Sequence, residues 1–186
     1  MITARSSSNS RSLAIKAILA LAGSLVLWAS AQVAVPMVPV PITLQTLAIP
    51  LIVLALGRNL AVFAVLAYLA EGALGLPVFS GHGGLARLVG PTAGYLWTYP
   101  VAAFAVGLLL DRGLDRTYVG RWIAIFAGTG VVFVGGVWWL AVGFHLGLDK
   151  ALAVGLVPFI IGDILKCSIA AGMSRQDARL FARLGI

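Results

Sequence analysis

The stretch from Ala151 to about Ala171 is a nearly unbroken run of apolar residues, long enough to cross a lipid bilayer. At about 1.5 Å per residue, a helix of about 20 residues spans the roughly 30 Å hydrocarbon core of a membrane. Because lipid offers the backbone no hydrogen-bond partners, such a run must bond its own backbone groups to one another. The run therefore predicts a membrane-spanning helix near the end of the chain.

Two charged side chains interrupt this run, Asp163 and Lys166. A charge at the centre of a bilayer costs about 2.5–3.5 kcal/mol on insertion scales. Because the two residues are three positions apart, they share one face of a helix and neutralise each other. The pair is either a functional site, the usual reason for charges inside a membrane, or an ion pair that only fixes how helices pack.

The composition of the whole chain predicts an all-α integral membrane protein. Of its 186 residues 61% are hydrophobic and 10% are charged, and no soluble domain of this size buries so much apolar surface. Long apolar runs, rather than ten-residue segments of alternating hydrophobicity, favour helices over a β-barrel. After loops and tails are subtracted, the chain has room for about six transmembrane helices.

We expect these six helices within residues 13–173. A disordered cytoplasmic tail, residues 1–12, precedes them because it is rich in Ser and Arg. A basic cytoplasmic tail, residues 174–186, follows them. The expected spans are residues 13–35, 42–56, 60–76, 90–110, 122–144 and 151–173.

The positive charges indicate how the chain crosses the membrane. Most Lys and Arg residues fall on the side of the N-terminus, whereas only Arg87 and Lys150 fall on the other side. By the positive-inside rule, both termini are therefore cytoplasmic. The net charge of +7 is explained by this topology, without nucleic acid as a partner. Asp163 would then lie roughly 18 Å below the outer surface, near mid-membrane.

Two unusual loops lie on the outer side in this topology. Residues 35–41 contain three prolines, which exclude a regular helix and give a stiff apolar segment, either a lid over a binding site or a linker. Residues 75–84 contain four glycines, which let the backbone approach a ligand closely. Ser80 and His82 are the polar candidates in this second loop.

Several polar side chains beside these loops have two possible roles. Thr43, Gln45 and Thr46 either cap the second span or hydrogen-bond a ligand. Tyr95 either belongs to an aromatic belt at the membrane interface or stacks on a ligand. Glu71 lies in the interface or points at a cavity.

The first span carries a stripe of small side chains. Ala14, Ala17, Ala20 and Ser24 recur every three or four residues, so they share one helix face. Such a stripe lets another helix approach closely. The approaching helix belongs either to this chain or to a separate subunit, and the sequence leaves both readings open.

Four motifs stand in order along the chain: VPVPITLQTL (38–47), GLPVF (75–79), GPTAGYL (90–96) and DILK (163–166). With these motifs the chain resembles the BioY family, the biotin-specific substrate-binding subunits (S components) of energy-coupling factor transporters. The resemblance covers nearly all of residues 13–173. It implies the S-component fold, high-affinity biotin capture from outside, and a place in the bacterial cell membrane, surrounded by lipid.

The resemblance also implies roles for individual residues. Asp163 and Lys166 match the acid and the lysine that hydrogen-bond the ligand, while Phe79 and Tyr95 would cover its thiophane ring. The expected substrate-binding residues are Asp163, Lys166, Tyr95, Gln45, Phe79 and Gly84. The expected contact face for a coupling subunit consists of Ala17, Ala20 and Ser24, although Ile18 and Leu21 stand where alanine is usual.

The partners implied by the resemblance are a transmembrane coupling subunit and two cytoplasmic ATPases. The chain itself lacks a Walker-type phosphate-binding loop, so ATP would be used by the partners, and we expect no cofactor and no enzyme activity. Cys167, the single cysteine, has no Cys or His cluster near it, so no metal site is expected.

Two other functions remain open at this point. One is a solitary secondary transporter that uses the Asp163–Lys166 pair as a proton relay, and the other is an S component for a different small vitamin. A membrane enzyme acting on lipid would need a nucleophile–base pair or a metal centre, which two isolated histidines in loops do not supply.

Overall fold

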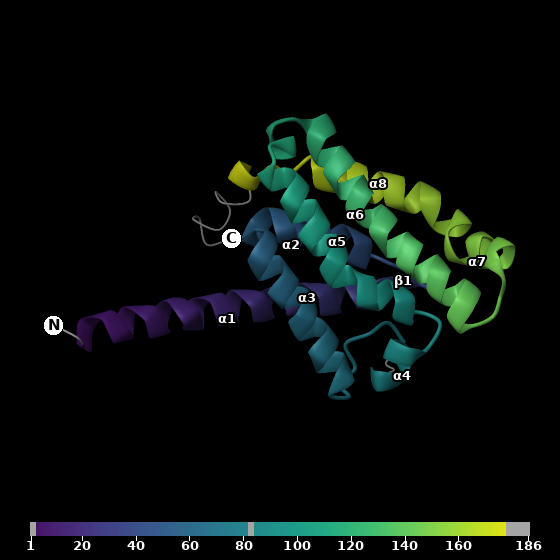
Figure 1. The fold of residues 1–186 in the computed structure, drawn as a ribbon, viewed down its shortest axis with the longest axis horizontal. Coiled ribbons are helices and arrows are strands. Elements are labelled where there is room, and N and C mark those ends of the chain that lie inside the picture. Colours follow the sequence, from purple (N-terminus) through teal and green to yellow (C-terminus); the bar gives the residue numbers. More distant parts are fainter. Residues whose placement is uncertain (1–2, 82–83, 178–186) are drawn as a thin grey trace.

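Figure 1 shows the computed structural model, which describes residues 3–81 and 84–177. Helices form almost all of this part of the chain, as predicted. In chain order the elements are α1 (Thr3–Gln32), β1 (Ala34–Val35), β2 (Ile42–Thr43), α2 (Gln45–Leu56), α3 (Arg58–Ala73), α4 (Gly84–Val89), α5 (Ala93–Asp111), η1 (Leu114–Arg116), α6 (Tyr118–Trp138), η2 (Trp139–Gly143), α7 (Leu148–Gly155), η3 (Val157–Phe159) and α8 (Ile160–Ala171).

Several of these helices are long and apolar enough to cross a membrane, which confirms a helical multi-pass membrane protein. Helix α2 has 12 residues and α3 has 16, so at about 1.5 Å per residue each is shorter than a full bilayer core. Within the described residues the stretches that meet the length of a span are Ser12–Gln32, Ala93–Asp111, Tyr118–Gly143 and Leu148–Ala171.

Helix α1 begins earlier than the sequence predicts. It starts at Thr3, so residues 3–12 are helical where a disordered tail was expected. The segment contains no Gly or Pro, so no residue in it stops the helix of the following apolar run from extending toward the N-terminus. Of the predicted basic tail, the structure describes residues 174–177 only, and residues 178–186 lie outside the described part.

The second half of α1 packs against α3 and α2, while its first half extends away from the other helices (Figure 1). Small residues make the contact close. A Cβ added at Gly23 would lie 2.7 Å from the Cβ of Ala64 on α3, so glycine is needed at this crossing.

Several helices pack against α5. Helix α5 lies against α6, α3 and α2, and α6 lies against α8 (Figure 1). Helix α2 also contacts α8, although more than a hundred residues separate them in sequence. The two polar segments singled out in the sequence, the start of α2 and the motif in α8, therefore meet inside the bundle.

The last predicted span is a broken helix, as Pro158 suggests. Helix α7 ends at Gly155, the short turn η3 contains Pro158, and α8 starts at Ile160. Proline lacks a backbone N–H and cannot continue the helical hydrogen-bond pattern. The break places Asp163 in the first turn of α8.

The proline-rich segment connects two short strands rather than two helices. Strands β1 and β2 pair antiparallel, with Ala34 opposite Thr43 and Val35 opposite Ile42. The second span therefore starts at Gln45 instead of Ile42. This strand pair, together with a bond from Leu44 N to Ser30 O of 3.2 Å, fixes where α2 begins.

Candidate functional site

A pocket of about 570 Å³, its open mouth included, lies where these segments meet. The loop before β2, the start of α2, the loop after α3, and helices α4, α5, α6 and α8 all contribute. Its lining residues are Val40, Pro41, Thr43, Gln45, Thr46, Phe79, Ser80, Arg87, Thr92, Tyr95, Leu96, Tyr99, Val132, Phe133, Phe159, Asp163 and Lys166.

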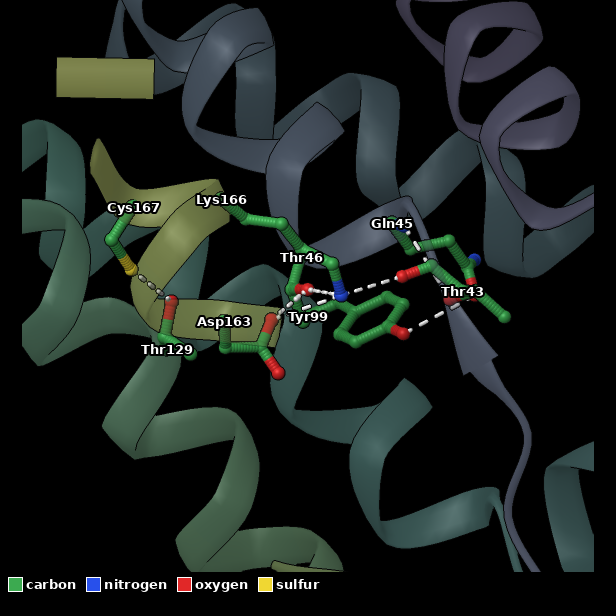
Figure 2. Close-up of polar contacts among 8 residues, drawn as sticks. All are labelled: Thr43, Gln45, Thr46, Tyr99, Thr129, Asp163, Lys166 and Cys167. Atoms are coloured by element: carbon green, nitrogen blue, oxygen red, sulfur yellow. Dashed lines mark hydrogen bonds and ion pairs between the residues drawn. The ribbon is translucent and has the colours of Figure 1, made fainter. Parts of the chain in front are cut away.

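The predicted ion pair lines this pocket. Figure 2 shows the pair and its polar contacts. Lys166 Nζ lies 3.1 Å from Asp163 Oδ1, and the two residues are only 8% and 4% exposed. The Thr46 hydroxyl donates a hydrogen bond to the same Asp163 oxygen. Both predicted charges are therefore buried, paired and held by a residue of α2.

The other carboxylate oxygen of Asp163 is different. Among the described residues, Oδ2 is buried and has no hydrogen-bond partner. Buried polar atoms almost always have a partner, and leaving one unpaired costs about 1–3 kcal/mol. Since Asp163 lines the pocket, this oxygen is a ready acceptor for a ligand N–H.

Lys166 has no N–H left for further protein partners. Its ammonium donates to Thr43 O at 2.8 Å, to Thr46 Oγ1 at 3.1 Å and to Asp163 Oδ1 at 3.1 Å. An ammonium group has three N–H donors, so these three acceptors satisfy it. The lysine therefore orients and neutralises Asp163 in this structure.

Gln45, expected to bind substrate, lines the pocket but is engaged by the protein. Its Nε2 donates to Tyr68 Oη at 2.8 Å, and its Oε1 accepts from Thr43 Oγ1 at 3.1 Å and from Tyr99 Oη at 3.3 Å. Figure 2 shows Gln45, Thr43 and Tyr99 beside the ion pair. Gln45 thus links β2, α3 and α5 through hydrogen bonds beside the ion pair.

Aromatic rings form an apolar wall of the pocket. Tyr95 stacks on Phe159 with ring centroids 6.4 Å apart and meets Phe133 edge-on at 6.3 Å. Its hydroxyl donates to Gly155 O at 2.8 Å, so the ring is held inside the bundle. The structure thus favours a role for Tyr95 in the pocket over one in an aromatic belt at the membrane interface. Phe133 and Phe159 were not predicted from the sequence, since apolar residues in apolar runs carry no distinguishing signal.

Phe79 lies in the wall as expected, and Gly72 makes room for it. A Cβ at Gly72 would come within 2.1 Å of the Phe79 ring, and Tyr68 meets the ring edge-on at 5.2 Å. Gly84 does not line the pocket, contrary to expectation. It starts α4, where a Cβ would lie 3.2 Å from Gly75 Cα, so its role is close backbone packing. The candidate His82 lies outside the described residues.

Arg87 lines the pocket and was missed as a site residue. From the sequence, this residue indicated only the topology. Helix α4 brings it to the pocket, where its guanidinium donates to Gly81 O at 3.4 Å. Within residues 3–81 and 84–177, no acidic side chain pairs with it. The position of Arg87 directly after the glycine-rich loop could have indicated a role in the site.

The predicted subunit-contact face is mostly used inside the chain. Ala20 is 9% exposed and Ser24 is fully buried, and both lie on the face of α1 that packs on the bundle, whereas Ala17 is exposed. The Ser24 hydroxyl lies 2.7 Å from Glu71 Oε1 on α3. The structure therefore favours packing within the chain for Ala20 and Ser24, and it places Glu71 between helices rather than in the pocket.

In the part of the chain that the structure describes, no group of three or more His, Cys, Asp or Glu side chains is placed so that it could hold a metal ion. Cys167 is buried on α8, with its sulfur 3.7 Å from Thr129 Oγ1.

Comparisons with known proteins agree with one another. The family model described as BioY family matches residues 4–183. A probable biotin transporter BioY of Pyrococcus horikoshii is 40% identical over 141 residues, which are 75% of this chain and 82% of the relative. The biotin transporter BioY of Thermotoga maritima is 38% identical over 142 residues, covering 76% and 82% of the two chains.

A solved structure supports the same conclusion at the level of the fold. The crystal structure of the S-component for biotin from an ECF-type ABC transporter superimposes with a TM-score of 0.75 and 26% sequence identity. The match covers 91% of this chain and 92% of that chain. By the extent of the family match and the identity to its relatives, this chain belongs to the BioY family.

Proposed function

We propose that this protein captures biotin as the substrate-binding S component of an ATP-driven energy-coupling factor importer. The observation that carries the proposal is Asp163 Oδ2, a buried acceptor without a partner among the described residues, on a residue that lines the pocket. The curated relatives are named biotin transporters, and the matching solved structure is the S-component for biotin.

The chemistry of biotin suits the two ends of the pocket. Its ureido group offers two N–H donors, and Asp163 Oδ2 accepts one of them. Because Lys166 neutralises Asp163, this end of the pocket suits an uncharged group. The thiophane ring packs on the apolar wall of Tyr95, Phe133 and Phe159, which excludes water from the polar contact.

Arg87 supplies the partner for the other end of biotin. The valerate chain ends in a carboxylate, and a guanidinium binds a carboxylate through two parallel N–H donors. Arg87 has no acidic partner within the described residues, so its charge is available for the ligand. In this orientation Asp163 binds the ureido group of biotin and Arg87 binds its carboxylate.

Six apolar helical segments form the membrane domain in this proposal: α1, α2, α3, α5, α6 and the broken α7–α8. Helices α2 and α3 are short but connect directly at Gly57, as two spans joined by a tight turn would. The positive-inside rule places both termini in the cytoplasm. A transmembrane coupling subunit and two ATPases then release biotin inward, and this chain makes and breaks no covalent bond.

A competition panel tests the ligand. Purified protein is loaded with labelled biotin and challenged with unlabelled biotin, thiamine or riboflavin. We expect displacement by biotin alone, and stronger displacement by thiamine or riboflavin would contradict the proposal.

Liposomes test the energy source. Protein reconstituted without partner subunits should bind biotin and should not concentrate it. Accumulation driven by a proton gradient would contradict the ATP-driven mechanism and would favour a solitary secondary transporter.

A further inference from the structure

We propose that Thr46 is a positioning residue for substrate selection: its hydroxyl fixes the Asp163 carboxylate so that Oδ2 faces the ligand. The inference rests on the proposed function and adds to it a residue that acts through Asp163 rather than on biotin. Figure 2 shows Thr46 between Lys166 and Asp163, with the second carboxylate oxygen of Asp163 pointing away from both.

The hydrogen-bond directions around Thr46 follow from its neighbours. A carboxylate only accepts and an ammonium only donates, so Thr46 donates to Asp163 Oδ1 and accepts from Lys166 Nζ at 3.1 Å. A hydroxyl carries one proton, and Asp163 already receives it. Thr46 therefore has no proton left to donate to a ligand, although it lines the pocket.

These bonds decide which carboxylate oxygen is free. Asp163 Oδ1 accepts from both Thr46 and Lys166, and Oδ2 is left buried without a partner among the described residues. Lys166 lies on the same helix and ends a flexible four-carbon stem, so on its own it fixes the carboxylate poorly. Thr46 comes from α2 and fixes the carboxylate from a second helix.

The backbone around Thr46 is itself fixed. Thr46 is the second residue of α2, and the pairing of β2 with β1 sets the entry into this helix. Thr43, three residues earlier, accepts from Lys166 Nζ through its carbonyl at 2.8 Å. A β-branched side chain has few χ1 rotamers, so the hydroxyl position follows from the backbone. The segment from Thr43 to Thr46 thus holds both members of the ion pair.

The test compares Thr46→Val, which keeps the shape and removes the hydroxyl, with Thr46→Ser, which keeps the hydroxyl. We expect Thr46→Val to weaken biotin binding about 10- to 100-fold, the usual effect of losing a hydrogen bond to a charged group. Thr46→Ser should bind within about threefold of the unmodified protein. Equal losses in both variants would overturn the proposal, because the methyl group would then matter rather than the hydroxyl.

Thr129→Val is the matched control. Thr129 is a buried threonine on α6 that contacts Cys167 and does not line the pocket, so its replacement should leave biotin affinity unchanged. A loss as large as that of Thr46→Val would overturn the proposal, because any buried threonine near α8 would then have the same effect. Size-exclusion chromatography confirms that each variant is folded.

Two further readouts separate positioning from direct contact. In an Asp163→Asn background, Thr46→Val should change affinity by less than about threefold, because its effect passes through the carboxylate. The ratio of affinities for biotin and for biotin methylated on its ureido nitrogens should also fall in Thr46→Val. Undiminished loss in the double mutant, or an unchanged ratio, would overturn the proposal. Failure of the unmodified protein to bind biotin would instead overturn the proposed function.

Discussion

Lys166 Nζ donates to the backbone carbonyl of Thr43 at 2.8 Å, a bond that joins α8 to strand β2 across 123 positions of sequence. The same ammonium contacts Asp163, so the proline-rich hairpin and the charged helix form one structural unit. A substitution in either the hairpin or the charged helix is therefore expected to affect the pocket.

Removing either member of the ion pair should weaken biotin binding more than about tenfold, which corresponds to about 1.4 kcal/mol. Asp163→Asn converts the free acceptor into an amide, and Lys166→Ala leaves a buried carboxylate uncompensated. Equilibrium binding to purified protein measures both, with the exposed Lys150→Ala as a control for loss of charge alone. Intact binding in both pocket variants would show that the pair is only structural.

Arg87→Gln should weaken binding of biotin about tenfold and hardly affect biotinamide, in which the carboxylate is replaced by an uncharged amide. The glutamine removes the charge and keeps a polar side chain with N–H donors. Parallel titrations with the two ligands measure the difference. Equal losses for biotin and biotinamide would mean that Arg87 does not recognise the carboxylate.

Gly72→Ala should displace Phe79 from the pocket wall and reduce biotin affinity, because the added Cβ would come within 2.1 Å of the ring. Gly130→Ala is the matched control, since no atom lies within 4 Å of the Cβ position at that glycine. Binding and thermal unfolding of both variants check this expectation. A neutral Gly72→Ala would indicate that Phe79 has room to move without loss of the site.

Tyr95→Phe should lower stability by about 1 kcal/mol, because it removes the buried hydrogen bond to Gly155 O. Biotin affinity should change little, since the ring remains in the wall beside Phe133 and Phe159. Tyr95→Ala should instead reduce affinity strongly. A large loss of affinity in Tyr95→Phe would show that the hydroxyl contacts biotin directly.

The sequence predicted those features that depend on local chemistry. Charges inside an apolar run pointed to Asp163 and Lys166, and three prolines pointed to the non-helical segment at residues 35–41. Long apolar runs predicted membrane helices. These signals are strong because lipid offers no partners to backbone polar groups and makes a charged side chain costly.

Features that depend on tertiary contacts were not predictable. Phe133 and Phe159 look like any other apolar residue until the fold brings α6 and the short turn η3 together. The amide of Gln45 is engaged by Tyr68 and Tyr99 from other helices, which no local pattern reveals. Ser24 was read as a possible surface for a partner, but its contact is Glu71 in α3.

The most direct measurement is the distance from Asp163 Oδ2 to biotin in an experimentally determined structure of the complex. We predict a ureido nitrogen at about 2.7–3.2 Å from this oxygen, the range of an N–H···O hydrogen bond, with the valerate carboxylate at Arg87. A reversed ligand, with its carboxylate beside Lys166 and its ureido group at Arg87, would contradict the account.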